Sequence, residues 1–139
     1  MNAEGNRPVL VIGLGCQSGC PASVLMGLIE VSLLEQRLSL SDITALASIE
    51  SKSNESGLLE VAELLRLPLG FFSADELIIF DKQLSHRSQI VFDVTGCYGV
   101  AESTALAMAS RLTGKNSRLL IQRRASSRAT FALAECTSL

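Results

Sequence analysis

Aromatic residues and histidine are scarce in this chain. Its 139 residues include no Trp, one Tyr, five Phe and a single histidine, His86. Proteins that bind single-stranded nucleic acid stack the bases on aromatic side chains and usually carry an excess of positive charge. Here the formal net charge is -2, so bulk attraction for a polyanion is also missing. The composition therefore predicts that nucleic acid is not a partner.

The cysteines form no pattern that is typical of a metal or redox site. Cys16, Cys20, Cys97 and Cys136 include no C-x-x-C pair, and one histidine is too few for a recognisable zinc set. A free cysteine most often behaves as a small buried apolar residue. We therefore expect four thiols, no metal and no cofactor.

Long hydrophobic runs are also missing. The first apolar segment, PVLVIGLG at residues 8–15, is much shorter than the ~20 residues that span a bilayer, and Arg7 gives it only a weak basic start. We expect a cytoplasmic protein with no membrane partner. With 47% hydrophobic residues, the chain suits one compact domain over residues 1–139, in which residues 1–7 form a flexible N-terminus.

Segments of strand and helix character alternate along the chain. The apolar run at 8–14 is typical of a strand that is covered on both faces, and Pro21 suits the start of the helix that follows. Ser73 and Glu76 form an S-x-x-E capping box, and Gly114 suits a helix end. Strands are predicted at 8–14, 43–50, 67–72, 118–123 and 129–134, and helices at 22–37, 58–65 (with Leu58, Leu59, Val61, Ala62 and Leu65 on its apolar face), 73–81 and 100–112; residues 89–94 have no clear assignment.

The order of these segments predicts the fold class. The last two strands are separated by too few residues for a crossover, so they should pair as an antiparallel hairpin. The alternation of strands and helices before them is typical of a parallel sheet. We expect a three-layer α/β/α fold, with a mainly parallel sheet of about five strands, helices on both faces and an antiparallel C-terminal edge hairpin.

The glycine-rich turn after the first strand has three interpretations. Gly13, Gly15 and Gly19 lie where a dinucleotide fingerprint would be, but G-x-G-x-x-G requires glycine where this chain has Ser18. A nucleotide-binding Rossmann-like domain is therefore the weaker alternative. Glycines before a helix also allow backbone N–H groups to approach an anion. The third interpretation is a sharp turn without a ligand.

Half of the basic residues lie in one segment. Residues 111–128 contain six Lys and Arg side chains and no Asp or Glu. Arg123 and Arg124 within this segment could provide cations for an anionic ligand. Arginines on an edge hairpin are also a common solvated surface that prevents aggregation, so both interpretations stay open.

Three sequence blocks carry a resemblance to a known family. They are VIGLGCQSG at 11–19, ALASIESKSNESGLLEVAELLRLPLGFFSADEL at 45–77 and GCYGVAESTALAMAS at 96–110. In this order they resemble the motifs of the C-terminal domain of the cobalamin-pathway protein CbiG and of its stand-alone relative CobE. The resemblance covers nearly the whole chain. One departure is that relatives commonly carry arginine after the cysteine, where Gln17 and Ser18 stand here.

The resemblance implies a role in building the corrin ring of cobalamin. In CbiG, the reaction is the opening of the ring A δ-lactone of cobalt-precorrin-5A, with release of a two-carbon fragment as acetaldehyde. The step of CobE is less well defined. The chain shows no match to the additional N-terminal regions of CbiG, so it resembles the CobE type, and lactone hydrolysis is the alternative. The implied partner is a precorrin-type tetrapyrrole, with other cobalamin-pathway enzymes as further candidates.

Such a ligand predicts where the site should be. A corrin precursor is a flat apolar macrocycle fringed with carboxylates, so its binder needs apolar surface together with cations and backbone donors. Ligands of open parallel sheets bind beyond the carboxyl ends of the strands, where we expect the glycine turn, the loop at 50–54 and the turn at 96–102 to meet. The candidate substrate-binding residues are Gly13, Gly15, Cys16, Gln17, Ser18, Gly96, Cys97, Tyr98, Gly99, Arg123 and Arg124.

Catalysis has fewer candidates. Glu50 or Glu102 could activate water as a general base, and Lys52 could stabilise an oxyanion or hold a substrate carboxylate. The simpler interpretations are a helix-capping charge for Glu102 and an exposed ion pair for Glu50 with Lys52. Cys16 is a weaker candidate nucleophile, and His86 is expected on the surface. Because no triad and no metal set are recognisable, the sequence favours a binder that carries or protects an intermediate over a hydrolase.

Overall fold

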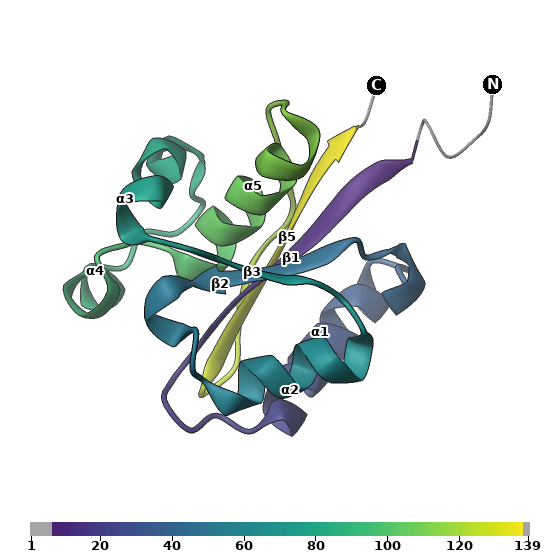
Figure 1. The fold of residues 1–139 in the computed structure, drawn as a ribbon, viewed down its shortest axis with the longest axis horizontal. Helices are drawn as coiled ribbons and strands as arrows, with labels where there is room; N and C mark the ends of the chain where they lie inside the picture. Colours follow the sequence, from purple (N-terminus) through teal and green to yellow (C-terminus); the bar gives the residue numbers. More distant parts are fainter. Residues whose placement is uncertain (1–6, 138–139) are drawn as a thin grey trace.

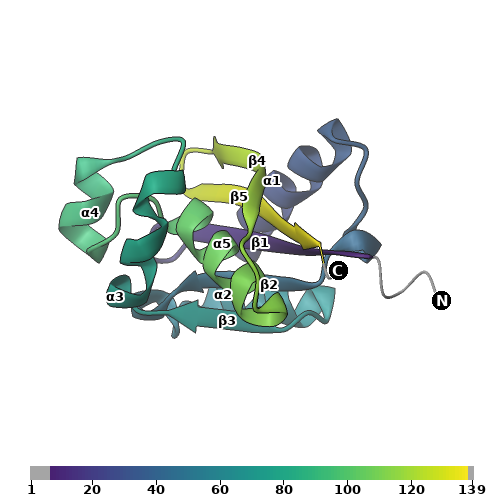
Figure 2. The same ribbon diagram turned by 90° about the horizontal axis from the view of Figure 1, so that it is seen from above.

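Five strands form one sheet within residues 7–137, which are the residues that the computed structural model describes. The order across the sheet is β3-β2-β1-β5-β4 (Figure 2). The expected flexible N-terminus falls largely on residues 1–6, which lie outside the described residues. The strands are β1 (Pro8–Cys16), β2 (Ala45–Ile49), β3 (Leu69–Phe72), β4 (Arg118–Ala125) and β5 (Ala129–Thr137).

The sheet combines a parallel and an antiparallel part. β1 pairs with β2 and β2 with β3 in parallel, whereas β5 pairs with both β1 and β4 in antiparallel orientation. The predicted α/β fold and its C-terminal hairpin are therefore confirmed. Since β5 runs against β1, the turn between β4 and β5 lies at the same end of the sheet as the carboxyl ends of β1 and β2.

Helices cover both faces of the sheet (Figure 1). α1 (Ala22–Glu35) and α2 (Ser56–Leu65) pack on one face, and α3 (Ala74–Leu77) and α5 (Val100–Thr113) lie on the other. α4 (Gln89–Thr95) lies beside the N-terminal end of α5. The segment without a clear assignment is thus a short helix, and Ser88 caps it by accepting a hydrogen bond from the N–H of Val91 at 3.2 Å.

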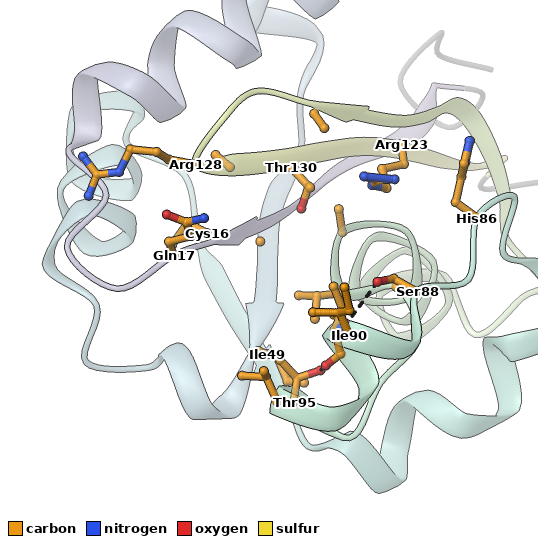
Figure 3. A pocket seen from close by; sticks show the side chains of 18 of the residues that line it. Cys16, Gln17, Ile49, His86, Ser88, Ile90, Thr95, Arg123, Arg128 and Thr130 are labelled. Atoms are coloured by element: carbon orange, nitrogen blue, oxygen red, sulfur yellow. Dashed lines mark hydrogen bonds between the residues drawn. The ribbon is translucent and has the colours of Figure 1, made fainter.

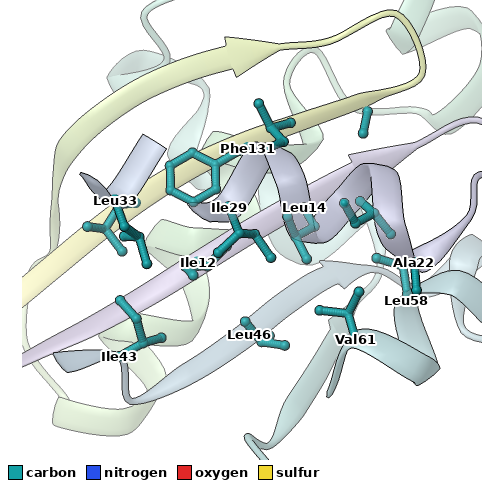
Figure 4. Close-up of a cluster of buried hydrophobic side chains, with 14 of the residues drawn as sticks. Ile12, Leu14, Ala22, Ile29, Leu33, Ile43, Leu46, Leu58, Val61 and Phe131 are labelled. Atoms are coloured by element: carbon teal, nitrogen blue, oxygen red, sulfur yellow. The ribbon is translucent and has the colours of Figure 1, made fainter. Parts of the chain in front are cut away.

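Alternating side chains of β1 enter two hydrophobic clusters. Ile12 and Leu14 (Figure 4), together with Leu10, belong to the cluster with α1 and α2. Val11 belongs to the cluster with α5. All four side chains are at most 4% exposed. The uninterrupted apolar run of this strand follows from this burial on both faces, because neighbouring side chains of a strand point in opposite directions.

Local signals place most helix boundaries close to the predicted positions. Ser73 and Glu76 form the predicted capping box: the Ser73 N–H donates to Glu76 Oε1 at 2.8 Å, and the Glu76 N–H donates to Ser73 Oγ at 3.2 Å. The helix continues from α3 as a 3-10 turn, Ile78–Gln83. One expectation was wrong: Leu59 does not lie on the buried face of its helix. It is 45% exposed, and the buried residues of α2 are Gly57, Leu58 and Val61.

Candidate functional site

A cavity of about 670 Å³ lies at the end of the sheet where β1 and β2 finish (Figure 3). Its wall is formed by the turns after β1 and β2, the loop and helix at 86–95, the N-terminus of α5, and the turn between β4 and β5. This is the edge of an open α/β sheet where ligands are expected. The glycine turn, Lys52 and Tyr98, which are far apart in sequence, therefore meet at one cavity.

The turn after β1 contributes Gly15, Cys16, Gln17 and Ser18 to the cavity wall. The backbone N–H of Gln17 donates to the carbonyl oxygen of Arg128 at 2.9 Å. This bond ties the glycine turn to the turn between β4 and β5. The two turns therefore form one continuous part of the wall.

Gly19 and Gly13, the other two glycines of this segment, have structural roles. Gly19 has a φ of 79°, and its N–H donates to Glu55 Oε2 at 2.7 Å. A carboxylate of the protein itself thus takes the donor that an external anion was expected to meet. Gly13 packs against α5, where any side chain would overlap the carbonyl oxygen of Ala101. Gly13 therefore lies outside the cavity wall.

Lys52 reaches the cavity, whereas Glu50 does not line it. β2 ends at Ile49 and the next three residues form a 3-10 turn, so Glu50 and Lys52 do not share one side as alternate residues of a strand would. Lys52 Nζ donates to Ser18 Oγ at 3.4 Å and pairs with Glu55 Oε1 at 3.9 Å. Glu50 is exposed to solvent, so of these two residues only Lys52 lies at the cavity.

Cys16 lines the cavity as a neutral thiol. Burial raises the pKa of the Cys16 thiol to about 11, although the nearby positive charge of Lys52 lowers it in part. The thiolate is the nucleophilic form of cysteine, so this environment argues against a nucleophilic Cys16. All four cysteines are free thiols.

Tyr98 and Gly99 form the wall between α4 and α5. The Tyr98 ring stacks on Phe92 with 4.4 Å between ring centroids, and the guanidinium carbon of Arg87 lies 4.4 Å from the Tyr98 centroid. The carbonyl oxygen of Tyr98 accepts a hydrogen bond from the Ser88 N–H at 3.0 Å. These contacts fix the ring between the loop before α4 and the helix itself.

Gly96 and Cys97 belong to the same turn but lie outside the cavity wall. Gly96 ends α4 with a φ of 80°, a conformation that favours glycine. Cys97 is buried, and its Sγ lies 3.1 Å from Ser103 Oγ. Both residues shape the turn that presents Tyr98, and neither is placed to touch a ligand in the cavity.

Glu102 lies in the first turn of α5, as predicted, but it is 1% exposed and does not line the cavity. Its carboxylate accepts hydrogen bonds from the backbone N–H groups of Ser85 and Arg123, each at 2.8 Å, and from Ser85 Oγ. These bonds join α5 to the loop before α4 and to β4. Since protein donors occupy both oxygens, Glu102 is not placed to activate water in the cavity directly.

The basic side chains of residues 111–128 point in different directions. Arg123 lines the cavity, and Arg128 lines it from the turn between β4 and β5. Arg124, the next residue after Arg123, forms an ion pair with Glu35 of α1 on the other face of the sheet. Neighbouring strand residues face opposite sides of a sheet. Arg124, which was expected to bind the ligand, therefore lies outside the cavity and forms an ion pair instead.

Sequence reasoning missed several residues of the wall. His86, expected only as a surface residue, is exposed and lines the cavity together with Ser88, Ile90 and Val94. Ile90 and Val94 are 79% and 80% exposed and lie one helical turn apart. The only sequence signal for them is the i, i+4 spacing of two apolar residues. The 7 residues of α4 are too few for this spacing to show a clear helical period.

The cavity combines positive charge with apolar surface. Among the described residues, those that line it include Lys52, Arg87, Arg123 and Arg128 and no Asp or Glu. The N-terminus of α5, which carries a partial positive charge, also lies in the wall, and no side chain among the described residues caps it. Because the chain as a whole has a charge of -2, positive charge is concentrated here. Apolar side chains, such as Ile49, fill much of the remaining wall.

Within residues 7–137, no group of three or more His, Cys, Asp or Glu side chains is placed to hold a metal ion. In the same part of the chain, every helix is too short or too polar to cross a membrane.

The sequence of the chain is similar to those of known proteins. The chain is 36% identical over 125 residues to Protein CobE of Sinorhizobium sp, a match that covers 90% of the chain and 79% of that relative. It is also 41% identical over 101 residues to the cobalt-precorrin-5A hydrolase of Priestia megaterium. That match covers 72% of the chain but only 26% of the hydrolase, so the chain corresponds to about a quarter of that enzyme.

Solved structures show the same fold. The crystal structure of CobE, a protein from the cobalamin (vitamin B12) biosynthetic pathway, superposes with a TM-score of 0.89 at 40% identity and covers 94% of this chain and 92% of that one. The cobalamin biosynthesis protein chiG from Agrobacterium tumefaciens str. C58 gives a TM-score of 0.68 at 25% identity, with coverage of 91% and 97%. Residues 10–134 match the family described as cobalamin synthesis G C-terminus. The chain therefore belongs to this CobE/CbiG family and is a cobalamin biosynthesis protein.

Proposed function

We propose that the cavity binds a precorrin-type tetrapyrrole, and that the protein carries or protects this intermediate or assists the processing of its ring A lactone and two-carbon fragment. The observation that carries the proposal is the composition of the wall. Lys52, Arg87, Arg123 and Arg128 lie around apolar surface, and the described residues that line the cavity include no Asp or Glu.

The apolar part of the wall suits the face of a macrocycle. Ile49, Val91 and Val100 contribute aliphatic surface from three different elements, and Ile90 and Val94 extend it along α4. Removing such surface from water stabilises a complex by about 25 cal/mol per Å². A cavity of about 670 Å³ is also within the range of small-molecule sites, roughly 300–1,000 Å³.

The basic part of the wall suits the carboxylates at the edge of a precorrin. Arg123 and Arg128 come from the β4–β5 hairpin, and Lys52 and Arg87 come from other segments, so the cations do not share one element. Cations that are spread in this way can pair with several acetate and propionate groups of one ligand. A neutral macrocycle would offer these cations no anionic partner, so we expect selectivity for a carboxylated tetrapyrrole.

Uroporphyrin, a stable coloured tetrapyrrole with acetate and propionate side chains, is a suitable probe. We expect its absorbance and fluorescence to change on titration with the protein, with one ligand per chain and weaker binding at high salt. A porphyrin that carries cationic side chains in place of carboxylates is the matched ligand control and should not bind. Equal binding of both porphyrins, or no spectral change with uroporphyrin, would overturn the proposal.

Arg123→Gln tests the cavity itself. Loss of one charge-assisted contact should weaken uroporphyrin binding at least about tenfold, since such bonds contribute about 1.5–3 kcal/mol. Arg118→Gln is the matched control, because Arg118 pairs with Glu135 on β5 outside the cavity. Both variants remove one positive charge, so an equal loss of affinity in both would indicate non-specific attraction.

Hydrolysis of the lactone is the second candidate function. It is favoured by the identity of 41% with a relative named cobalt-precorrin-5A hydrolase. The purified protein would be incubated with a lactone-bearing precorrin, and the product would be analysed by mass spectrometry. Gain of one water by the substrate, with or without the subsequent loss of acetaldehyde, supports an enzyme. Recovery of unchanged substrate in a saturated complex supports a carrier.

A further inference from the structure

Hydrogen bonds connect the buried Glu102 to the cavity through Ser85 and His86. Ser85 Oγ donates to Glu102 Oε2 and lies 2.8 Å from His86 Nδ1. His86 itself lines the cavity. In Figure 3 it lies on the same side of the view as Arg123. A series of hydrogen bonds therefore leads from the buried Glu102 side chain on α5 to the cavity wall.

The direction of the protons along this chain follows from its end. The Glu102 carboxylate accepts from two backbone N–H groups, those of Ser85 and Arg123, and a carboxylate can only accept. The Ser85 hydroxyl proton therefore points to Glu102, which leaves an oxygen lone pair for the imidazole. His86 Nδ1 then carries a proton and donates it to Ser85 Oγ. As a result Nε2, the other ring nitrogen, carries a lone pair that can accept a proton.

The charges around the imidazole have opposing effects. Arg87 in the same loop and Arg123 on β4 contribute positive charge to the cavity wall, whereas Glu102 on α5 carries negative charge and is linked to the ring through Ser85. Lys52 pairs with Glu55, which does not line the cavity, and the described residues that line it include no Asp or Glu beside Arg87 or Arg123. A ligand carboxylate that enters would balance them and would also favour a proton on Nε2.

We propose that His86 is a ligand-binding residue whose Nε2 takes up a proton from solvent when a carboxylated tetrapyrrole enters the cavity. The protonated ring then donates a charge-assisted hydrogen bond to a ligand carboxylate. Ser85 and Glu102 are positioning residues, because they hold the ring without touching the ligand. This inference rests on the proposed function, and it adds that binding is coupled to proton uptake.

Calorimetric titration with uroporphyrin measures the coupling directly. At about pH 8 histidine side chains are generally neutral and carboxylates are ionised, so uptake of a proton would come from the imidazole. Titrations in phosphate and in Tris, which differ in ionisation enthalpy, give the number of protons taken up. We expect up to one proton per chain, and affinity that rises by as much as about tenfold per pH unit as the pH falls toward 6.

His86→Gln and Ser85→Ala separate the roles. Glutamine places an amide near the position of Nε2 but cannot change its charge, so His86→Gln should bind uroporphyrin with affinity that is constant between about pH 6 and 8. Ser85→Ala keeps the imidazole and removes its link to Glu102, so proton uptake should fall although the titratable ring remains. Arg118→Gln should keep the wild-type proton uptake.

Because His86 is the only histidine of the sequence, its ring can be observed without ambiguity. In protein labelled with ¹⁵N-histidine, the free wild type should show the tautomer that is protonated at Nδ1. Ser85→Ala should shift it toward the Nε2-protonated form. Addition of uroporphyrin to the wild type should give the doubly protonated ring.

The outcomes distinguish this inference from the proposed function. Absence of uroporphyrin binding would overturn both. Binding with the same proton uptake in the wild type and in His86→Gln would overturn the role of His86 alone and leave the cavity as the binding site. Unchanged uptake and an unchanged tautomer in Ser85→Ala would overturn the positioning role of Ser85 and Glu102.

Discussion

Gly13 of β1 and Ala101 of α5 contact each other through their backbones. A Cβ atom on Gly13 would overlap the carbonyl oxygen of Ala101 and would lie 2.8 Å from the backbone nitrogen of Ala105. The absence of a side chain therefore allows α5 to lie directly on the sheet. Gly15, two residues further along the same face of β1, lines the cavity beside the start of α5. The close approach at Gly13 thus sets the position of the helix end that forms the cavity wall.

Gly13→Ala should therefore destabilise the protein strongly. The added methyl group meets backbone atoms, which cannot move aside by a change of rotamer, so α5 must shift away from β1. Overpacking of a well-packed core usually costs 1–3 kcal/mol, and we expect about 3 kcal/mol or more here. Urea unfolding followed by circular dichroism measures this change in the free energy of unfolding.

Gly27→Ala is the control for that substitution. Gly27 lies within α1, and a Cβ atom there would meet no atom of residues 7–137 within 4 Å. Alanine favours the helix by about 0.5–1 kcal/mol relative to glycine, so this variant should be slightly more stable than the wild type. Similar stability of the Gly13→Ala and wild-type proteins would show that α5 does not depend on this contact.

Ile90 should contribute to ligand binding but little to folding. It is 79% exposed on α4 and lines the cavity, so Ile90→Ser removes apolar surface that water already reaches. We expect a change of at most about 0.5 kcal/mol in stability, and an affinity for uroporphyrin that falls about tenfold, which corresponds to about 1.4 kcal/mol. Leu34→Ser on α1, where the side chain is 75% exposed, should leave the affinity unchanged. Equal losses in both variants would count against α4 as part of the site.

The predictable part of the fold has strong local signals. Burial on both faces gives β1 its continuous apolar run, and Ser73 with Glu76 marks the start of α3 by a pair of reciprocal hydrogen bonds. Such signals act within a few residues, so one sequence is enough to recognise them. β2 shows the limit of this reasoning, because its predicted end at Glu50 is already a 3-10 turn.

The site was less predictable, because side-chain direction depends on the tertiary structure. Arg123 and Arg124 look alike in the sequence, yet one lines the cavity and the other pairs with Glu35. Glu102 was expected near a ligand, but a neighbouring loop, with Ser85 at its centre, covers its carboxylate. His86 reaches the cavity only because that same loop folds across the start of α5. None of these long-range contacts has a local sequence pattern.

The capping box at Ser73 should contribute stability that depends on pH. The backbone N–H of Ser73, and to a lesser extent Arg111, lowers the pKa of Glu76 below its usual value. The stabilisation is therefore present above the pKa of an unfolded glutamate, about 4.3, and is lost as the pH falls through the lower folded value. Glu76→Gln should be less stable than the wild type at pH 7 and similar to it at about pH 2. Urea unfolding at both pH values tests this, and a difference that is the same at both would contradict it.

The Cys16 thiol should resist alkylation in the folded protein. Burial raises its pKa to about 11, against about 8.5 for an exposed cysteine, so little thiolate is present at pH 8 to 9. Iodoacetamide labelling, followed by site-resolved mass spectrometry, should give a rate at Cys16 that still rises above pH 10 in the folded state and levels off near pH 9 in urea. Lys52→Met, which removes the opposing positive charge, should shift the native profile to still higher pH.

The raised pKa of the Cys16 thiol also affects stability. Because the folded state holds the proton more tightly, the stabilising contribution of Cys16 is complete below about pH 8.5 and is lost as the pH rises toward 11. A native rate that levels off near pH 9 would mean that the thiol is not buried, and Cys16 would again be a candidate nucleophile in the cavity.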